Sequence, residues 1–476
     1  MIQRHKTAIG RTDLSRPFRL ALAAGLIRGA DSVLDYGCGR GDDVRSLQAL
    51  GFDCVGWDPV HAPEGEKRES DVVNLGYVLN VIEDPEERTK TLRAAWGLAR
   101  RALIVAARVD IQAQPQKAEE HGDGVVTSRS TFQKFYTQTE LRGWLDDELD
   151  SRSVAAGPGI FFIFRDQTDR HRFASALVRR RLSAPFGHVS EALFEENRTA
   201  LEPLVDFFRE RGRLPHPDEL STAAELTFAF GSIPKAFRAV RNVLADEAWD
   251  EAEEARRNDL LVYLALERFG KRPRFGELPL ELQYDIKAFW GAYTRACGEA
   301  DALLFSLGDA ELVSDTCASA PVGKVTAEAL YVHTEGLELL PPRLRLFEGC
   351  ARVMVGEVEG ANIIKLDRTR PKVSYLSYPD FDDLPHPTLS SSVVVWLDTM
   401  AAKLYDFSGR ENPPILHRKE SFVPADYPRR QLFARLTRQE EKRGLLEKSG
   451  IGTLKPWNEL LEEKGVRLAG HVLRKA

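Results

Sequence analysis

Short apolar runs alternate with helical patterns over about the first third of the chain. Runs rich in β-branched and aromatic residues predict buried strands at 32–36, 52–58, 71–77, 102–108 and 159–166. Apolar spacing and end signals predict helices between them, at 42–50, 83–99 and 137–149. Strands that alternate with helices in this way indicate a mostly parallel sheet. We therefore expect an α/β domain over residues 1–168.

The middle of the chain is helical by its apolar spacing, and we expect a helical domain over residues 169–310. It opens with an arginine-rich stretch, RHRFASALVRRR (170–181), that is typical of a connector or a basic helix. A weak internal repeat relates 209–220 to 267–278, each a helix ended by glycine, a proline turn and a new helix. Two interpretations stay open: a recurring helical connection, or a pair of helix-turn-helix nucleic-acid modules.

The character of the sequence changes again near residue 322. The segment 343–378 is rich in β-branched and aromatic residues with glycine breaks, and it predicts three strands. The segments 392–407 and 428–447 have helical patterns. We expect a small α+β domain over residues 311–476.

Composition narrows the class of protein. The 476 residues are 43% hydrophobic and 29% charged, with a net charge of −6. That charge excludes a protein that coats nucleic acid by bulk attraction, but it leaves room for local basic patches. No apolar stretch is long enough to span a membrane, and the N-terminus is charged rather than signal-like. We expect a cytoplasmic protein with no membrane partner.

Cysteines and histidines show no metal-binding pattern. The five cysteines are scattered without a CxxC pair, which fits a reducing compartment. The histidines, His386 and His417 among them, lack the spacing of metal ligands along the chain. The sequence therefore predicts no metal site.

A glycine-rich turn follows the first predicted strand, in VLDYGCGRG (33–41). Such a turn serves NAD, FAD or S-adenosylmethionine, so glycine alone does not identify the ligand. Asp35 ends the strand, and Asp42 and Asp43 open the next helix. Three carboxylates would repel a pyrophosphate, whereas S-adenosylmethionine carries a cationic ammonium and a cationic sulfonium. The sequence therefore favours S-adenosylmethionine.

The second predicted strand supplies another carboxylate. Asp58 at its end is placed to accept hydrogen bonds from both ribose hydroxyls of the cofactor. The pattern resembles motifs I and II of class I methyltransferases, which have a Rossmann-like fold. The cofactor-binding residues that this resemblance implies are Asp35, Gly37, Gly39, Gly41 and Asp58. The adenine contact stays open among Glu64, Glu66, Glu69 and a backbone group.

The reaction end offers candidates at the close of the third predicted strand. Asn74-Leu-Gly-Tyr77 occupies the position where amino-methylating DNA methyltransferases carry an (Asp/Asn)-Pro-Pro-(Tyr/Phe) motif. The resemblance implies that Asn74 accepts hydrogen bonds from the target amine and that Tyr77 stacks on a flipped base. Both prolines are absent here, and the segment aligns equally well with small-molecule methyltransferases that lack this motif.

A wider likeness covers most of the chain. The segments that carry it are RHKTAIGRTDLSRPFRLAL (4–22), DYGCGRGDD (35–43), GWDP (56–59), DVVNLGYVLNVIEDPEER (71–88), TFQKFYTQTELRGWL (131–145) and NPPILHRKESFV (412–423). They resemble the DNA phosphorothioation-associated methyltransferase family. The resemblance implies a bacterial DNA-modification context, with proteins of such a system as partners, and leaves the methylated atom open.

We therefore expect an S-adenosylmethionine-dependent methyltransferase with a Rossmann-like class I domain, a mainly helical domain and a small α+β domain. The favoured acceptor and partner is nucleic acid, DNA first. Two alternatives stay open: methylation of a small molecule or another macromolecule, and a non-catalytic cofactor-binding component of a DNA-modification or defence complex. A basic groove that joins Arg170–Arg181 to the catalytic cleft would favour nucleic acid.

Overall fold

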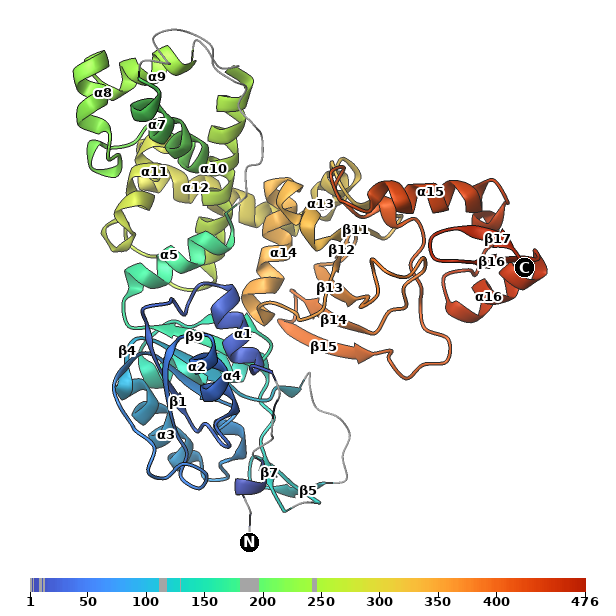
Figure 1. Cartoon of the computed structure of the whole chain (residues 1–476), viewed down its shortest axis with the longest axis horizontal. Helices are drawn as coiled ribbons and strands as arrows, with labels where there is room; N and C mark the ends of the chain where they lie inside the picture. Colours follow the sequence, from blue (N-terminus) through green and yellow to red (C-terminus); the bar gives the residue numbers. More distant parts are fainter. Residues whose placement is uncertain are drawn as a thin grey trace. The chain divides into compact units, whose positions relative to one another are not determined.

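The computed structural model describes residues 2, 4–7, 11, 13–110, 118–128, 130–179, 197–241 and 246–476 (Figure 1). The chain divides into two compact units. The first comprises Met1–Arg170, Cys317–Leu337 and Cys350–Ala476, and the second comprises His171–Thr316 and Glu338–Gly349. The predicted domain limits at 168 and 310 stay predictions, because these units are not continuous in sequence.

The N-terminal part of the chain is built around a six-stranded mixed sheet. Its strands lie in the order β2 (Asp53–Trp57), β1 (Ser32–Tyr36), β3 (Ser70–Gly76), β4 (Ala99–Ala106), β9 (Ile160–Phe164) and β8 (Val154–Gly157). Strands β1 to β4 are parallel, and β9 runs antiparallel to both of its neighbours. The chain leaves β1 for β2 on one side and returns to β3 on the other, which makes a topological switch point beside β1.

Helices and a small sheet accompany these strands. The helices are η1 (Arg4–Thr7), α1 (Arg16–Ala23), α2 (Asp42–Ala49), η2 (Leu79–Val81), α3 (Pro85–Leu98) and α4 (Gln138–Leu149). The small sheet consists of β5 (Ala118–His121), β6 (Gly124–Thr127) and β7 (Phe132–Gln133). Local chemistry sets the helix starts: Asp84 accepts from the Glu86 N–H, and Thr137 and Glu140 form a reciprocal capping box.

The sheet core explains why the strand predictions succeeded. Side chains of β4 and β9, such as Leu103, Ile104, Phe161 and Phe162, are at most 1% exposed on both faces of the sheet. A sheet covered on both faces needs continuous apolar strands, and continuous runs are what the sequence shows. The predicted Rossmann-like α/β class is confirmed. The short strand β8 was not predicted.

The helical region holds two copies of one arrangement, in green and yellow in Figure 1. The first copy is α7 (Arg198–Arg211), η4 (Pro217–Glu219), α8 (Ala223–Phe230) and α9 (Ile233–Arg241). The second is α10 (Asp246–Leu266), η5 (Glu267–Phe269), η6 (Phe275–Glu277), α11 (Leu280–Trp290) and α12 (Tyr293–Phe305). Helix α5 (Gln167–Leu177) precedes them, and η7 (Ser306–Gly308) and α13 (Ala310–Ala318) follow. The weak sequence repeat therefore corresponds to a structural repeat.

The C-terminal part contains a six-stranded antiparallel sheet, in sequential order. Its strands are β10 (Lys324–Val325), β11 (Ala329–His333), β12 (Ile363–Asp367), β13 (Lys372–Ser377), β14 (Ser391–Trp396) and β15 (Ala401–Asp406). The accompanying elements are η8 (Thr334–Leu339), α14 (Pro342–Val355), η9 (Lys419–Ser421), α15 (Arg430–Glu441), η10 (Leu445–Glu447), α16 (Leu454–Glu463), β16 (Val466–Leu468) and β17 (Leu473–Lys475). The predicted mixture of helix and strand is confirmed.

Two element predictions here were wrong. The segment 392–407 forms the hairpin of β14 and β15 and not a helix, because its run of valines pairs along β13. The start of the segment 343–378 forms α14 and not a strand, since Leu344, Phe347, Ala351 and Met354 recur at helical spacing and are all buried. Among the helices of the described residues, none is long and apolar enough to cross a membrane.

Candidate active site

A cavity of about 310 Å³ opens at the carboxyl ends of β1, β2 and β3. These ends meet at the topological switch point, where open α/β sheets bind their ligands. Gly37 and Gly39 line the cavity after β1, Asp58 lines it after β2, and Tyr77 lines it after β3. Four of the seven residues predicted from the sequence therefore meet at one cavity.

The glycine turn holds a backbone that other residues rarely adopt. Gly37, Gly39 and Gly41 have φ values of 89°, 52° and 72°, in the left-handed region. A Cβ on Gly37 would overlap Val78 Cγ2, so the close approach also requires glycine. Gly41 is the N-cap of α2 and does not line the cavity. The turn thus places bare backbone against the space that a ligand would fill.

Asp58 is already engaged by backbone groups. One of its oxygens accepts from the Gly39 N–H at 3.1 Å, and the other accepts from the Val60 and His61 N–H groups at 2.9 and 2.8 Å. A carboxylate offers about four acceptor sites, so about one remains for a ribose hydroxyl. The sequence predicted only that Asp58 holds both ribose hydroxyls. In the structure Asp58 also holds the glycine turn and the loop after β2 in place.

Asp35 and Asn74 form a buried pair on adjacent strands. They lie opposite each other in register, and the Asn74 amide donates to Asp35 Oδ1 at 2.8 Å. Asp35 is 3% exposed and Asn74 2%, and burial raises the pKa of Asp35 to about 7. Neither residue lines the cavity. The sequence put Asn74 at the acceptor end, but the structure turns its side chain toward Asp35, because that carboxylate needs a donor.

Tyr77 holds the position that the sequence suggested. It follows β3 with φ of 60°, an unusual conformation for a bulky residue, and its N–H donates to the Ala106 carbonyl at 2.7 Å. Burial raises the pKa of its hydroxyl. The ring therefore borders the cavity on a backbone that is anchored to β4.

The N-terminal segment supplies further lining residues. Arg4, Thr7 and Arg11 line the cavity. Arg4 pairs with Glu83 at 2.8 Å and with Glu87 at 2.6 Å. These pairs fasten the segment to the start of α3.

The acids that open α2 also hold this segment. Asp42 accepts from the Arg11 N–H at 2.8 Å, and Asp43 accepts from the Ser15 N–H at 2.7 Å. The carboxylates that disfavour a pyrophosphate therefore have a structural task as well.

Other lining residues carried no sequence signal. Trp57, Val60 and His61 border the cavity, whereas Glu64, Glu66 and Glu69, the acidic candidates for the adenine contact, do not. Trp57 lies beside Tyr36, with ring centroids 4.9 Å apart. Val60 and His61 lie in the short connection between β2 and β3, which has no helix of its own.

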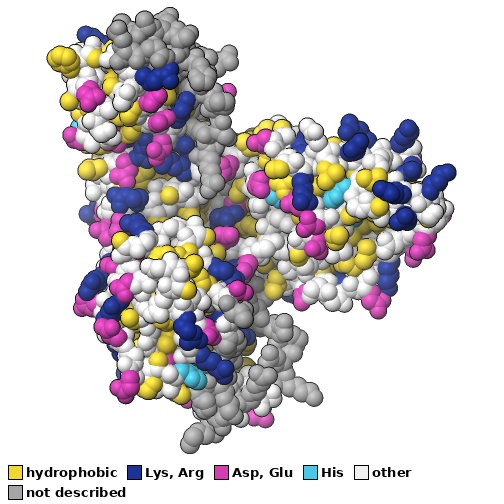
Figure 2. All heavy atoms as spheres, in the orientation of Figure 1, with side chains coloured by type: hydrophobic (Ala, Val, Ile, Leu, Met, Phe, Trp, Pro, Cys, Tyr) yellow, Lys and Arg dark blue, Asp and Glu magenta, His cyan; other side chains and the backbone are white. Residues whose placement is uncertain are grey.

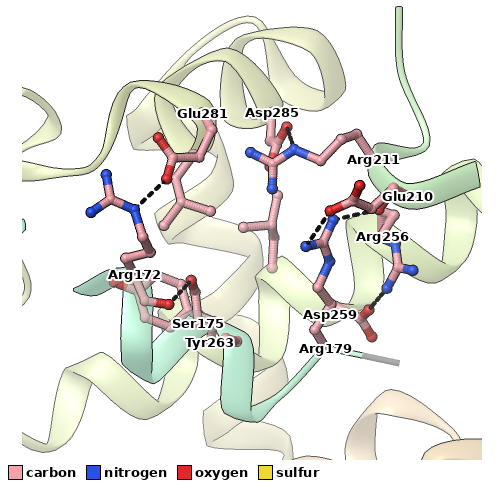
Figure 3. Close-up of a pocket in the computed structure, with 13 residues that line it drawn as sticks. Arg172, Ser175, Arg179, Glu210, Arg211, Arg256, Asp259, Tyr263, Glu281 and Asp285 are labelled. Atoms are coloured by element: carbon pink, nitrogen blue, oxygen red, sulfur yellow. Dashed lines mark hydrogen bonds and ion pairs between the residues drawn. The ribbon is translucent and has the colours of Figure 1, made fainter. Parts of the chain in front are cut away.

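A second cavity, of about 330 Å³, lies in the helical unit (Figure 3). Four arginines and four acids line it, and each arginine pairs with one acid. The pairs are Arg172–Glu281 at 2.9 Å, Arg179–Glu210 at 3.0 Å, Arg211–Asp285 at 3.5 Å and Arg256–Asp259 at 2.8 Å. This cavity is therefore electrically balanced.

The arginine-rich stretch differs from the basic surface that the sequence suggested. Arg170 is buried, Arg172 and Arg179 are paired with acids, and Arg180 and Arg181 lie outside the described residues. The acids come from helices of the repeats, so sequence position alone did not reveal them.

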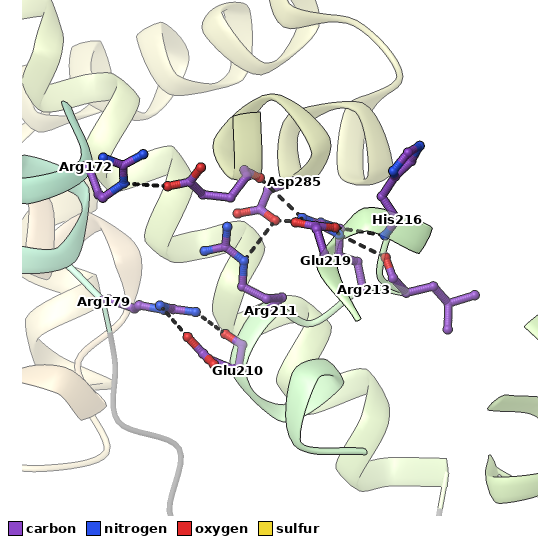
Figure 4. A network of polar contacts seen from close by, with 10 residues as sticks. Arg172, Arg179, Glu210, Arg211, Arg213, His216, Glu219 and Asp285 are labelled. Atoms are coloured by element: carbon purple, nitrogen blue, oxygen red, sulfur yellow. Dashed lines mark hydrogen bonds and ion pairs between the residues drawn. The ribbon is translucent and has the colours of Figure 1, made fainter. Parts of the chain in front are cut away.

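The same network continues to Arg213 (Figure 4). Its guanidinium, 5% exposed, donates to Asp285 at 2.6 Å and to both oxygens of Glu219 at 2.7 and 2.8 Å. Glu219 also accepts from the His216 N–H at 2.8 Å. The Gly-Arg-x-Pro turn of the first repeat is thus an internal junction between helices.

A family model matches the part of the chain that holds this cavity. Residues 10–148 match a family model described as a methyltransferase domain. A solved structure of Burkholderia thailandensis 1,6-didemethyltoxoflavin-N1-methyltransferase, with bound 1,6-didemethyltoxoflavin and S-adenosylhomocysteine, is 16% identical to this chain. It covers 34% of this chain and 77% of its own, with a TM-score of 0.23. A search of curated proteins gave no match.

The fold and the family model define a class I methyltransferase domain at residues 10–148. The protein is an S-adenosylmethionine-dependent methyltransferase, and S-adenosylmethionine is its cofactor.

Proposed function

We propose that the protein methylates a base in nucleic acid, DNA first, as part of a bacterial DNA-modification system linked to phosphorothioation. The link to phosphorothioation rests on the resemblance of the N-terminal and C-terminal motifs. The cofactor-binding roles of Asp35, Gly37, Gly39, Gly41 and Asp58 belong to the same proposal. Transfer would depend on holding the sulfonium methyl group and the acceptor atom in line, which lowers the barrier without an acid or a base.

The observation that carries the nucleic-acid proposal is the basic face of α9. Helices α8 and α9 are joined by a turn of only two residues, Gly231 and Ser232. The second helix buries Ala236, Phe237 and Val240 against its neighbours. On its other side it exposes Lys235, Arg238 and Arg241, the last of which pairs with exposed Asp250 at 3.1 Å. A helix with one apolar and one cationic face is suited to a phosphate backbone.

The surface charge supports a local contact rather than bulk attraction. On the face shown in Figure 2, Lys and Arg side chains are interspersed with Asp and Glu side chains over the described residues. With a net charge of −6, nucleic acid must therefore be held by particular cations.

Tyr77 supports a planar acceptor. A base that leaves the stack needs an aromatic or apolar partner in the pocket, and Tyr77 presents a ring there. Asn74 is left out of this proposal, since its side chain is buried, donates to Asp35 and does not line the cavity.

The first experiment identifies the acceptor. Full-length protein is incubated with methyl-labelled S-adenosylmethionine and with DNA, RNA or a metabolite extract. Label in DNA supports the proposal. Label only in the metabolite fraction would favour a small-molecule methyltransferase, and cofactor binding with no label in any fraction would favour a non-catalytic component.

The second experiment tests α9. Replacing Lys235 and Arg238 by alanine should reduce the slope of log affinity against log salt by up to about 1.8, since each lost phosphate contact removes about 0.9. The charge-matched control replaces Arg93 and Arg172, which pair with Glu148 and Glu281. Equal slopes for the two double variants would contradict a role for α9.

A further inference from the structure

Two histidines and one glutamate meet inside the C-terminal part of the chain, away from the cofactor cavity. One donor atom from each of His386, His417 and Glu440 lies within 4.8 Å of the other two. Glu440 is completely buried, and His386 is 7% exposed. The rings of His386 and His417 are 4.5 Å apart, and each is 4.6 Å from the ring of buried Trp457. The cluster is therefore compact, with His386 and Glu440 buried and His417 half-buried.

Backbone carbonyls determine which nitrogen of each ring carries a proton. His386 Nδ1 donates to the Leu416 carbonyl at 3.1 Å, and His417 Nε2 donates to the Ile451 carbonyl at 2.8 Å. A neutral imidazole has one donor and one acceptor nitrogen, so the lone pairs are on His386 Nε2 and His417 Nδ1. A carbonyl that orients the far nitrogen of a histidine is also the usual support of a metal-binding imidazole.

The acceptor atoms of the two imidazoles and the carboxylate are not all matched by hydrogen-bond donors among the described residues. His386 Nε2 lies 2.7 Å from Glu440 Oε1, so a neutral His386 would set two acceptors against each other. A proton on His386 would resolve that single contact. It would leave His417 Nδ1 and Glu440 Oε2, both buried atoms with no hydrogen-bond partner among the described residues. One metal ion would satisfy all three side chains.

We propose that His386, His417 and Glu440 form a binding site for a divalent transition-metal ion of the Zn²⁺ type. Two imidazoles and one carboxylate are a common ligand set for zinc with one position left open. Zinc ligands lie about 2.0–2.2 Å from the ion, which separates two ligands by about 3.3 Å in tetrahedral geometry. The observed spread of donor atoms needs only small side-chain rotations to reach that arrangement.

The scaffold of this site joins three distant segments. His386 lies in the loop before β14, His417 follows β15, and Glu440 lies on the buried face of α15. The loops are tied by a bridge between Thr388 and Ile415 and by a hydrogen bond from the Leu416 N–H to the Pro387 carbonyl at 3.2 Å. The ion would therefore hold α15 to the loops that flank the last hairpin of the sheet. The sequence predicted no metal because these ligands have no common spacing.

The experiment uses the full-length protein after treatment with a chelator. Zn²⁺ is titrated against a chromophoric chelator, melting temperature is followed in parallel, and Co²⁺ is added separately as a spectroscopic probe. We expect one equivalent of Zn²⁺ per chain, a higher melting temperature with Zn²⁺, and visible Co²⁺ bands of an imidazole-containing site. His417→Gln and Glu440→Gln should each weaken Zn²⁺ affinity at least tenfold. His333→Gln, which alters a buried histidine in β11 outside the cluster, should bind Zn²⁺ like the original protein.

The wild-type titration decides the matter even if a variant fails to fold. Uptake well below one equivalent, with no change in melting temperature, would overturn the proposal and leave a protonated His386 paired with Glu440. Stoichiometric uptake that His417→Gln and Glu440→Gln do not weaken would also overturn it, because the metal would then bind elsewhere.

Discussion

Replacing Asp35 by asparagine should make the protein more stable at neutral pH, although Asp35 is a proposed cofactor residue. The carboxylate is 3% exposed and receives a hydrogen bond from Asn74, while buried Asn74 Oδ1 has no hydrogen-bond partner among the described residues. An asparagine at position 35 keeps an acceptor for the Asn74 amide. The substitution therefore removes a buried charge while it retains the hydrogen bond between the two strands.

The magnitude follows from the pKa of Asp35. Burial raises this pKa from 3.8 to about 7 in the folded chain. Each pKa unit corresponds to about 1.36 kcal/mol, so the ionised carboxylate lowers the free energy of unfolding by up to about 4 kcal/mol. The folded chain binds the Asp35 proton more tightly than the unfolded chain does. The stability that this proton contributes is therefore fully present below pH 3.8 and is lost as pH rises through about 7. The advantage of Asp35→Asn should grow from about 2 kcal/mol at pH 5 to about 4 kcal/mol at pH 8.

Urea unfolding of both proteins at pH 5 and pH 8 measures this difference. Asp71→Asn is the matched control, because Asp71 accepts from the Ser32 N–H and hydroxyl at 2.9 and 2.7 Å and these bonds lower the pKa of Asp71. Its replacement should destabilise the chain by nearly the same amount at pH 5 and pH 8, because both values lie above the ordinary pKa of 3.8 and this carboxylate stays ionised at each. An Asp35→Asn protein that is less stable at pH 8, or whose advantage does not grow with pH, would refute the reasoning.

Three further outcomes are expected. Tyr77→Ala should lower DNA methylation at least tenfold, about 1.4 kcal/mol of transition-state stabilisation, and leave cofactor affinity nearly unchanged, whereas Tyr77→Phe should have a mild effect. A parallel loss of methylation, cofactor binding and thermal stability in Tyr77→Ala would show that the ring only packs. Asp58→Ala should weaken binding of S-adenosylhomocysteine by about 1–3 kcal/mol in calorimetry, and unchanged affinity would contradict its role. Arg213→Ala should destabilise the helical unit by about 3–5 kcal/mol, since Glu219 would lose its guanidinium partner and buried Asp285 would keep only the longer pair with Arg211 at 3.5 Å. Thermal unfolding measures this loss, and an unchanged melting temperature would contradict it.

The methyltransferase class could be predicted because its evidence is local. The turn of Gly37, Gly39 and Gly41 lies in one continuous segment, and its left-handed backbone can be anticipated from the glycines themselves. Strands β1, β3, β4 and β9 are mostly buried, so each one reads as an apolar run without knowledge of its partners. The start of α4 is also a local feature, because the capping box of Thr137 and Glu140 lies within four residues.

The roles of individual polar side chains depend on partners that come from elsewhere in the chain. The amide of Asn74 donates to Asp35 because the two strands lie in register. Asp58 accepts from three backbone N–H groups, one in the glycine turn after β1 and two in the loop after β2. Arg172 and Arg179 appear in sequence as a basic stretch, yet acids of other helices neutralise them. A sequence shows which charges are present, but not which of them face each other.

Periodicity alone also misread the C-terminal part. The segment 392–407 forms β14 and β15 because hydrogen bonds to β13 and across the hairpin outweigh its local helical pattern. His386, His417 and Glu440 meet only after the loops and α15 pack together. The sequence by itself determined the cofactor turn and the class of the enzyme, because those depend on backbone conformation within a few residues. Only the tertiary structure decided which side chains share a cavity, which charges cancel, and which lone pairs converge, since these depend on contacts between residues far apart in the chain.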